Sequence, residues 1–367
     1  MLYILGSMFD THKINYIIKI SGKLLISILT IISIFSCTTI KPQIDISSLK
    51  EINKYIIDNF NSCSKDNLEK FLFNENIVNS IEKSDLNSIK ISPLTKWNLN
   101  REDIIQEKIS FNSPFTYIDT NNHKDKAIFY FYRKKDRNNH KVILWIPGYG
   151  VSNLAFHFIK NFFKNELDNG YSVIFYNIPY HLERIKKGNK TGEGVFSGNI
   201  IYNLNFVKKS LEEIRTILFF LKTNGYTSIS GWGGSLGASL LWLSSYQHKY
   251  NHLTLLIPVV DWNTVFFNPY LKEVVNKLKK NGISEKLIKK SYNNISPLYY
   301  KSKTLSKNIQ ILYSKFDQLT SENKTLEFAG KFKIKNIHGY NESHATILLN
   351  NNVYKDNLKF LERLDKN

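Results

Sequence analysis

The sequence predicts an α/β protein with a mostly parallel β-sheet that helices cover on both faces. Short apolar segments, each typical of a buried strand, alternate with longer segments whose apolar residues recur at helical spacing. Two of these helical segments end at a glycine, Gly170 and Gly225, and glycine commonly terminates helices. This alternation is typical of βαβ units, whose parallel strands lie buried between two helical layers.

The expected elements follow one another after residue 110. Strands are predicted at 127–135, 140–148, 171–179, 226–234, 253–260, 308–314 and 331–337. Helices are predicted at 153–170, 205–225, 235–247 and at the C-terminus. The segment 262–308 is too long for a simple connection and contains helical patterns, so we expect it to form a helical cap inserted over the sheet. The whole α/β domain is expected over residues 91–367.

The chain before this domain divides into two parts. Residues 1–36 are predicted to be a signal peptide, because basic residues at 12–23 precede an uncharged apolar run at 24–35 that is short for a membrane span. Residues 37–90 are predicted to hold a polar tether, to about residue 46, and then a small helical region.

The end of the apolar run, Ser36-Cys37, resembles the cleavage box of bacterial lipoproteins. That resemblance implies that Cys37 carries lipid and that the protein is exported to the cell envelope and anchored in a membrane. Phe35 departs from the small residue usual in such a box, and an uncleaved N-terminal anchor is the alternative. Met8 is an alternative start that would leave the signal intact.

Charge and cysteine content exclude several classes of function. The formal charge of +19 is spread as scattered lysines, without an arginine-rich stripe, so we expect no nucleic-acid partner. The sequence has only two cysteines, Cys37 and Cys63. If Cys37 carries lipid, no disulfide is possible, and two cysteines without a paired-histidine motif predict no metal site.

Ser235 stands at the most informative point of the sequence. Gly233-Gly234-Ser235-Leu236-Gly237 follows a predicted strand and opens a predicted helix. A strand–turn–helix elbow of this G-x-S-x-G type exposes the serine oxygen as a nucleophile, and the helix N-terminus beneath it stabilises developing negative charge. Ser235 is therefore the candidate nucleophile.

A nucleophilic serine needs a base and an acid that orients the base. Asp317 follows the predicted strand 308–314, and His344 lies between the last predicted strand and the last helix. Both lie at carboxyl ends of strands, where sites assemble in open α/β sheets. Asp261 is the alternative acid, with helix capping as its ordinary role, and His338 is the alternative base.

The glycines around Tyr149 predict the rest of the reaction site. Gly148 and Gly150 flank Tyr149 after the predicted strand 140–148. The turn resembles the His-Gly-x motif of hydrolases, with Pro147 in place of the histidine. The backbone N–H groups of Tyr149 and Leu236 are the candidate oxyanion hole.

Taken together, these motifs resemble the α/β-hydrolase superfamily from about residue 110 to 367. The "NIPYHLER" stretch at 177–184 and the "GYG" turn are similar to the α/β-hydrolase domain-containing-protein-18-like branch. The branch resemblance implies that His181 and Arg184 bind substrate, by lining the pocket or gripping an anionic group.

The resemblance implies a serine hydrolase that cleaves carboxylic acyl esters through an acyl-enzyme, needs no cofactor, and has lipid esters among its candidate substrates. A catalytically silent lipoprotein that uses the scaffold to bind a ligand or partner is the alternative. A basic nucleic-acid binder is a third hypothesis, and it predicts steeply salt-dependent binding to duplex DNA.

Overall fold

The computed structural model describes residues 41–81, 86–116, 124–135 and 140–365. The predicted signal peptide and Cys37 lie outside the described residues. Within the described ranges, no helix combines the length and the apolar character needed to cross a bilayer.

The described strands form one sheet in the order β1-β2-β3-β5-β4-β6-β7-β8-β9. Pairing is antiparallel from β1 to β5 and parallel from β5 to β9. The strands are β1 (Lys90–Pro93), β2 (Ile104–Thr116), β3 (Lys124–Lys134), β4 (Lys141–Ile146), β5 (Ser172–Asn177), β6 (Ser228–Gly234), β7 (Leu253–Leu256), β8 (Ile309–Ser314) and β9 (Asn336–Tyr340).

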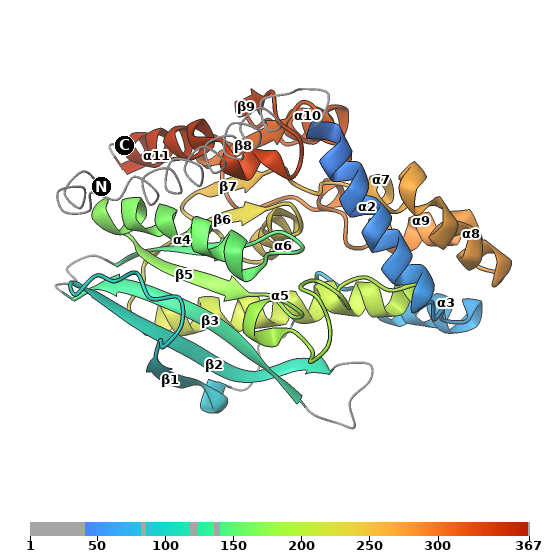
Figure 1. Ribbon diagram of the computed structural model, residues 1–367, viewed down its shortest axis with the longest axis horizontal. Helices are drawn as coiled ribbons and strands as arrows, with labels where there is room; N and C mark the ends of the chain where they lie inside the picture. Colours follow the sequence, from blue (N-terminus) through green and yellow to red (C-terminus); the bar gives the residue numbers. More distant parts are fainter. Residues whose placement is uncertain (1–40, 82–85, 117–123, 136–139, 366–367) are drawn as a thin grey trace, which may run out of the picture.

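Helices lie on both sides of this sheet (Figure 1). They are α2 (Lys41–Asp58), α3 (Lys65–Asn74), α4 (Asn153–Asp168), α5 (Ile200–Thr223), α6 (Leu236–Ser245), α7 (Trp262–Phe266), α8 (Lys272–Lys280), α9 (Glu285–Asn293), α10 (Glu322–Lys331) and α11 (Asn351–Asp365). The expected fold class, a mostly parallel sheet covered on both faces, is confirmed.

The buried strand β4 shows why the central strands are nearly continuous apolar runs. Val142 and Leu144 belong to one hydrophobic core, whereas Ile143 and Trp145 belong to a second core on the opposite face. Because successive side chains point to opposite faces, a strand covered on both sides needs an apolar residue at every position. The first core packs against α5 and α6, and the second against α4 and α11.

The segment 262–308 contains α7, α8 and α9, together with short 3-10 turns. α9 packs against α5 and α7, and α8 packs against α2. In Figure 1 these helices and α2 lie together on one side of the molecule, away from β1.

Two of the predicted boundaries that differ from the structure lie at the ends of the sheet. The last strand was expected at 331–337 but spans 336–340, because Lys331 still belongs to α10 and Lys333 turns the chain with a φ of 56°. The sheet also begins earlier than expected, at β1 and β2, before residue 110. In both regions, pairing with a neighbouring strand decides where the strand begins and ends.

Helix α2 begins at Lys41 and therefore takes in residues that were expected to be a polar tether. Its buried residues, Lys41, Asp45, Leu49 and Ile56, recur at spacings that place them on one face of the helix. Leu49 and Ile56 join the first hydrophobic core. The two charged residues are buried because other parts of the chain supply their partners, which local sequence does not reveal.

Candidate active site

Ser235 forms a sharp elbow between β6 and α6. Its backbone has φ 50° and ψ −113°, a sparsely populated conformation for a residue with a side chain. The surrounding backbone holds it there: the Ser235 N–H donates to the Leu256 carbonyl at 2.8 Å, and the Ser235 carbonyl accepts from the Ser239 N–H at 3.1 Å. Conformational strain of this kind is typical of a nucleophile elbow.

Two glycines of the motif are needed because backbone approaches them closely. A Cβ at Gly237 would lie 2.0 Å from the Ile146 carbonyl oxygen, and one at Gly233 would lie 2.7 Å from the Cα of Ala238. A Cβ at Gly234 would meet only ordinary contacts, the nearest at 3.7 Å. The helix thus packs directly on β4 and β6, and this packing sets the elbow.

His344 and Asp317 lie beside Ser235 in hydrogen-bond order. The His344 Nε2 is 2.8 Å from the Ser235 Oγ, and its Nδ1 is 2.8 Å from the Asp317 Oδ2. Because a carboxylate can only accept, Nδ1 carries the proton and Nε2 is left to accept from the serine hydroxyl. The structure therefore brings together the three predicted residues from the ends of three parallel strands, β6, β8 and β9.

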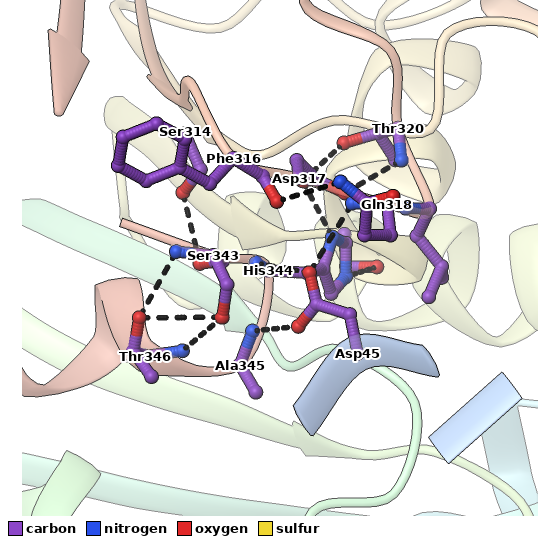
Figure 2. Close-up of polar contacts among 12 residues, drawn as sticks. Asp45, Ser314, Phe316, Asp317, Gln318, Thr320, Ser343, His344, Ala345 and Thr346 are labelled. Carbon is purple, nitrogen blue, oxygen red and sulfur yellow. Dashed lines mark hydrogen bonds and ion pairs between the residues drawn. The ribbon is translucent and has the colours of Figure 1, made fainter. Parts of the chain in front are cut away.

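The Asp317 carboxylate is fixed by its own loop (Figure 2). Its Oδ1 accepts from the backbone N–H groups of Leu319 and Thr320, both at 2.7 Å, and its Oδ2 accepts from the Thr320 hydroxyl at 2.6 Å. The side chain is 1% exposed. These bonds leave Oδ2 oriented toward the His344 ring, as an orienting acid requires.

The surroundings of His344 favour its charged form. Burial alone disfavours the imidazolium, but the Asp317 carboxylate, by charge and by hydrogen bond, and the Asp45 carboxylate outweigh burial and raise the pKa of His344 above its ordinary value. A base with this environment stabilises the positive charge that it gains when it takes a proton.

The alternative acid and base lie elsewhere. Asp261 caps α7, where its Oδ1 accepts from the Asn263 N–H at 3.0 Å. His338 lies within β9, paired with Leu312, and is exposed. No hydrogen bond joins either residue to Ser235 in the described structure. The capping role is sufficient to account for Asp261.

The turn that carries Tyr149 lies against the serine elbow. A Cβ at Gly148 would lie 3.3 Å from the Ser235 Cβ, and Gly150 has a φ of 78°, which favours glycine. Among the described residues, no acceptor is found for the backbone N–H of Tyr149 or of Leu236. The two predicted oxyanion donors are therefore available beside the serine.

His181 holds the Tyr149 turn through a hydrogen bond to Gly150 and does not line the cavity at Ser235. The side chain is fully buried, its Nε2 accepts from the Gly150 N–H at 2.8 Å, and its Nδ1–H donates to the Pro179 carbonyl at 2.9 Å. The expectation that His181 binds substrate is thus corrected: both ring nitrogens are used within the protein. Its contact with Gly150 fixes the turn next to Tyr149.

Arg184 is also not available to bind substrate. Its guanidinium is buried and pairs with Glu213 at 2.8 and 2.9 Å and with Asp125 at 2.8 Å, and it donates to the Asn177 carbonyl at 3.0 Å. A buried charge this fully paired is structural, and breaking such a pair typically costs about 3–5 kcal/mol. The expectation of an anion-gripping arginine is corrected, because its donors already have acceptors.

The environment of His181 predicts a stability that depends on pH. Burial, and then the charge of Arg184, lower the pKa of His181 from 6.5 to about 4. The unfolded chain therefore binds a proton that the folded protein does not, and unfolding becomes easier as pH falls from 6.5 toward 4. The total loss from this one group is about 3 kcal/mol.

Urea unfolding of wild-type protein and His181→Gln at pH 7 and pH 5 measures this effect. The glutamine carbonyl can still accept from the Gly150 N–H but does not titrate. Wild type should lose about 2 kcal/mol more than the variant between the two pH values. Parallel losses in the two proteins would show that His181 does not carry the pH dependence.

A cavity of about 640 Å³ opens at Ser235 and His344. Its walls include Trp145, Trp232 and Tyr149, and the exposed rim carries charged residues of α2 and of the segment 190–193. A second, apolar chamber of about 30 Å³ also adjoins Ser235, and Ile52 and Tyr149 line both spaces. Within the described ranges, no group of three His, Cys, Asp or Glu side chains could hold a metal ion.

Asp45 is a site residue that sequence reasoning missed. Its carboxylate, on α2, accepts backbone N–H bonds from the loops that carry Asp317 and His344 (Figure 2). The helical spacing of Lys41, Asp45 and Leu49 was the signal available in the sequence, because it places two charges on the apolar face of α2.

No family model matches the sequence, and no curated protein matches it. Solved structures match its shape. Acetyl xylan esterase 1 from a Thermoanaerobacterium species aligns with a TM-score of 0.52 and 12% identity, over 83% of this chain and 98% of the esterase chain. A prolyl endopeptidase aligns with a TM-score of 0.50 and 14% identity, over 72% of this chain and 39% of its own. The chain adopts the α/β-hydrolase fold.

In this α/β-hydrolase fold, the elbow, the acid loop and the histidine loop follow β6, β8 and β9 in chain order. The order Ser, Asp, His is the one expected for an α/β hydrolase. The similarity to the domain-containing-protein-18-like branch stays a prediction.

Proposed function

We propose that the protein is a serine hydrolase that cleaves carboxylic esters through an acyl-enzyme. The observation that carries this proposal is the unbroken chain of hydrogen bonds from the Ser235 Oγ through His344 to the Asp317 carboxylate, at 2.8 Å for each step. The arrangement stands on a strained elbow beside an open cavity. These features together favour an enzyme over a silent scaffold.

In the proposed reaction, the Ser235 Oγ attacks the ester carbonyl carbon and its proton passes to the His344 Nε2. The Asp317 carboxylate holds the Nδ1–H and stabilises the imidazolium. The N–H groups of Tyr149 and Leu236 donate to the oxyanion. His344 then protonates the leaving alcohol. Water, deprotonated by the same nitrogen, releases the acid and restores the serine.

The two cavities at Ser235 suggest where each part of the ester binds. The apolar chamber is lined by Leu236, Trp262 and Phe266, and by Ile52 of α2, and is suited to the acyl group. Its volume of about 30 Å³ accommodates two or three water-sized groups, hence a short acyl chain. The larger cavity, with its charged rim, suits the alcohol portion. Short-chain esters are therefore favoured over long-chain lipid esters.

A fluorophosphonate probe tests the proposed activity without knowledge of the substrate. The probe should label the wild-type protein once, and mass spectrometry should place the label on Ser235. A folded protein that neither takes the label nor hydrolyses p-nitrophenyl esters would support the alternative of a binding scaffold.

Chain-length dependence tests the acyl chamber. The value of kcat/KM should be highest for acetyl to butyryl esters and fall at least about 10-fold by the octanoyl ester, because a filled apolar pocket rejects added methylenes. Leu49→Ala, on α2, removes part of the wall of this chamber and not of the larger cavity, and it should shift the preference toward longer chains. Ile57→Ala, on α2 but outside both cavities, is the matched control. A preference of the wild type for long chains would contradict the proposed acyl side.

A further inference from the structure

The Asp45 carboxylate is buried at the junction of the two loops that carry the acid and the base. It is 1% exposed. Its Oδ2 accepts from the backbone N–H of His344 at 2.8 Å and of Gln318 at 3.2 Å, and its Oδ1 accepts from the N–H of Ala345 at 3.1 Å. Figure 2 shows the carboxylate between these groups, with α2 entering from one side.

These contacts tie together two segments that are separate in the chain. Gln318 directly follows the acid Asp317, whereas His344 and Ala345 belong to the loop after β9. A single carboxylate thus sets the distance between the acid loop and the histidine loop. An error of about 1 Å in the position of a reacting group can cost about 100-fold in rate. The Asp45 carboxylate therefore affects the spacing of the acid loop and the histidine loop, a distance to which catalysis is sensitive.

Lys41, one helical turn before Asp45, holds the same histidine loop. Its Nζ donates to the Asn341 carbonyl at 2.8 Å and pairs with the Glu342 carboxylate at 2.8 Å. Glu342 in turn accepts from the Thr346 hydroxyl at 2.7 Å. Lys41 and Asp45 are both buried. The first two turns of α2 therefore bind the histidine loop both before His344, through Lys41, and after it, through Asp45.

We propose that Asp45 is a positioning residue for His344: it joins the acid and histidine loops and adds a second negative charge behind the imidazole. The proposal rests on the hydrolase function proposed above. In the described structure, Asp45 has no hydrogen bond to Ser235 and does not line the cavity at Ser235, so it acts through His344 and not on the substrate.

The charge of Asp45 distinguishes this role from a purely structural one. Burial raises the pKa of Asp45, whereas the charge of His344 and the N–H groups of His344 and Ala345 favour its ionised form. The ionised carboxylate raises the proton affinity of His344 in turn. A helix anchor without an electrostatic role would affect stability but not the titration of the histidine.

Asp45→Asn is the decisive variant, because the amide oxygen can keep one or two of the three N–H bonds while the charge is lost. Its kcat should fall between about 10- and 100-fold with little change in KM. The acid limb of its pH profile of kcat/KM should move to lower pH, because His344 now loses its proton more readily. Asp45→Ala, which leaves all three N–H groups without an acceptor, should lose more activity.

Two matched controls are available. Asp66→Asn makes the same chemical change at an exposed position of α3, and Ser47→Ala changes an exposed neighbour of Asp45 on α2. Both should keep the wild-type kcat and pH profile. If Asp45→Asn also keeps both, or loses activity with an unmoved acid limb, Asp45 is not a positioning residue for His344.

An NMR titration of the histidine rings separates this inference from the proposed function. It needs no substrate. The pKa of the His344 ring, assigned with a His344→Gln variant, should be lower in Asp45→Asn than in wild type. An unlabelled, inactive wild type with this shift would overturn the hydrolase proposal but show that Asp45 controls His344. An unchanged His344 titration beside normal labelling would overturn the role of Asp45 alone.

Discussion

Ser235→Ala is expected to lower the hydrolysis of short p-nitrophenyl esters by about 10⁴-fold or more, because the proposed nucleophile is removed while the rest of the site remains. Stability should change by no more than about 1 kcal/mol, the net contribution of one hydrogen bond. The backbone bonds of residue 235 to Leu256 and Ser239 do not depend on the side chain. Steady-state kinetics and a thermal melt of the same preparation measure both effects.

Ser245→Ala is the matched control for this substitution. Ser245 is buried at the end of α6, the helix that follows Ser235. Its hydroxyl donates to the Trp242 carbonyl and to the Ser302 hydroxyl, and it lies outside both cavities at Ser235. The control should keep turnover within a few-fold of wild type. Turnover above about one per cent of wild type in Ser235→Ala would exclude Ser235 as the nucleophile.

Asp317→Asn is expected to reduce turnover by about 10⁴-fold, as the same change does in a well-studied triad. The reason lies in the acid loop. The amide oxygen is held toward the N–H groups of Leu319 and Thr320, which donate to the Oδ1 of Asp317. The amide nitrogen then faces the His344 Nδ1 as a donor. This arrangement places the ring proton on Nε2, and His344 can no longer accept from Ser235.

Asp261→Asn provides the comparison for Asp317→Asn. Asparagine is as good a helix N-cap as aspartate, so α7 should keep its cap and turnover should stay within a few-fold of wild type. Both variants replace an aspartate with an asparagine. The same chemical change is thus made at two positions that each follow a strand of the sheet. A larger loss in Asp261→Asn than in Asp317→Asn would move the acid to the loop after β7.

Much of the fold could be predicted because its signals are local. The apolar run of β4 and the glycine-rich motif after β6 each report burial or backbone geometry within a few residues. The end of the sheet was less predictable. The segment 331–337 has an alternating pattern that fits a strand, yet pairing with β8 begins only at Asn336. The strand preference of a short alternating segment is weak, so the strand with which it pairs decides where it begins.

Ser235, Asp317 and His344 could be placed by sequence because each follows a strand, and the carboxyl ends of parallel strands meet at one edge. Local sequence could not assign the roles of His181 and Arg184. A polar side chain in a loop has the same local pattern whether it faces a ligand or buried backbone. Only the folded chain shows that His181 accepts from Gly150 and that Arg184 pairs with Glu213.

Asp45 shows most clearly what local sequence does not predict. Local pattern predicts a helix near it, but its partner His344 is 299 positions away in the chain, and its role depends on backbone N–H groups that two distant loops bring together. A carboxylate on a helix is normally solvated, because burial without partners is costly. The residues proposed to carry the chemistry are thus marked by local turns and strand ends. The residues that support them are selected by long-range hydrogen bonds, which form only when the chain is folded.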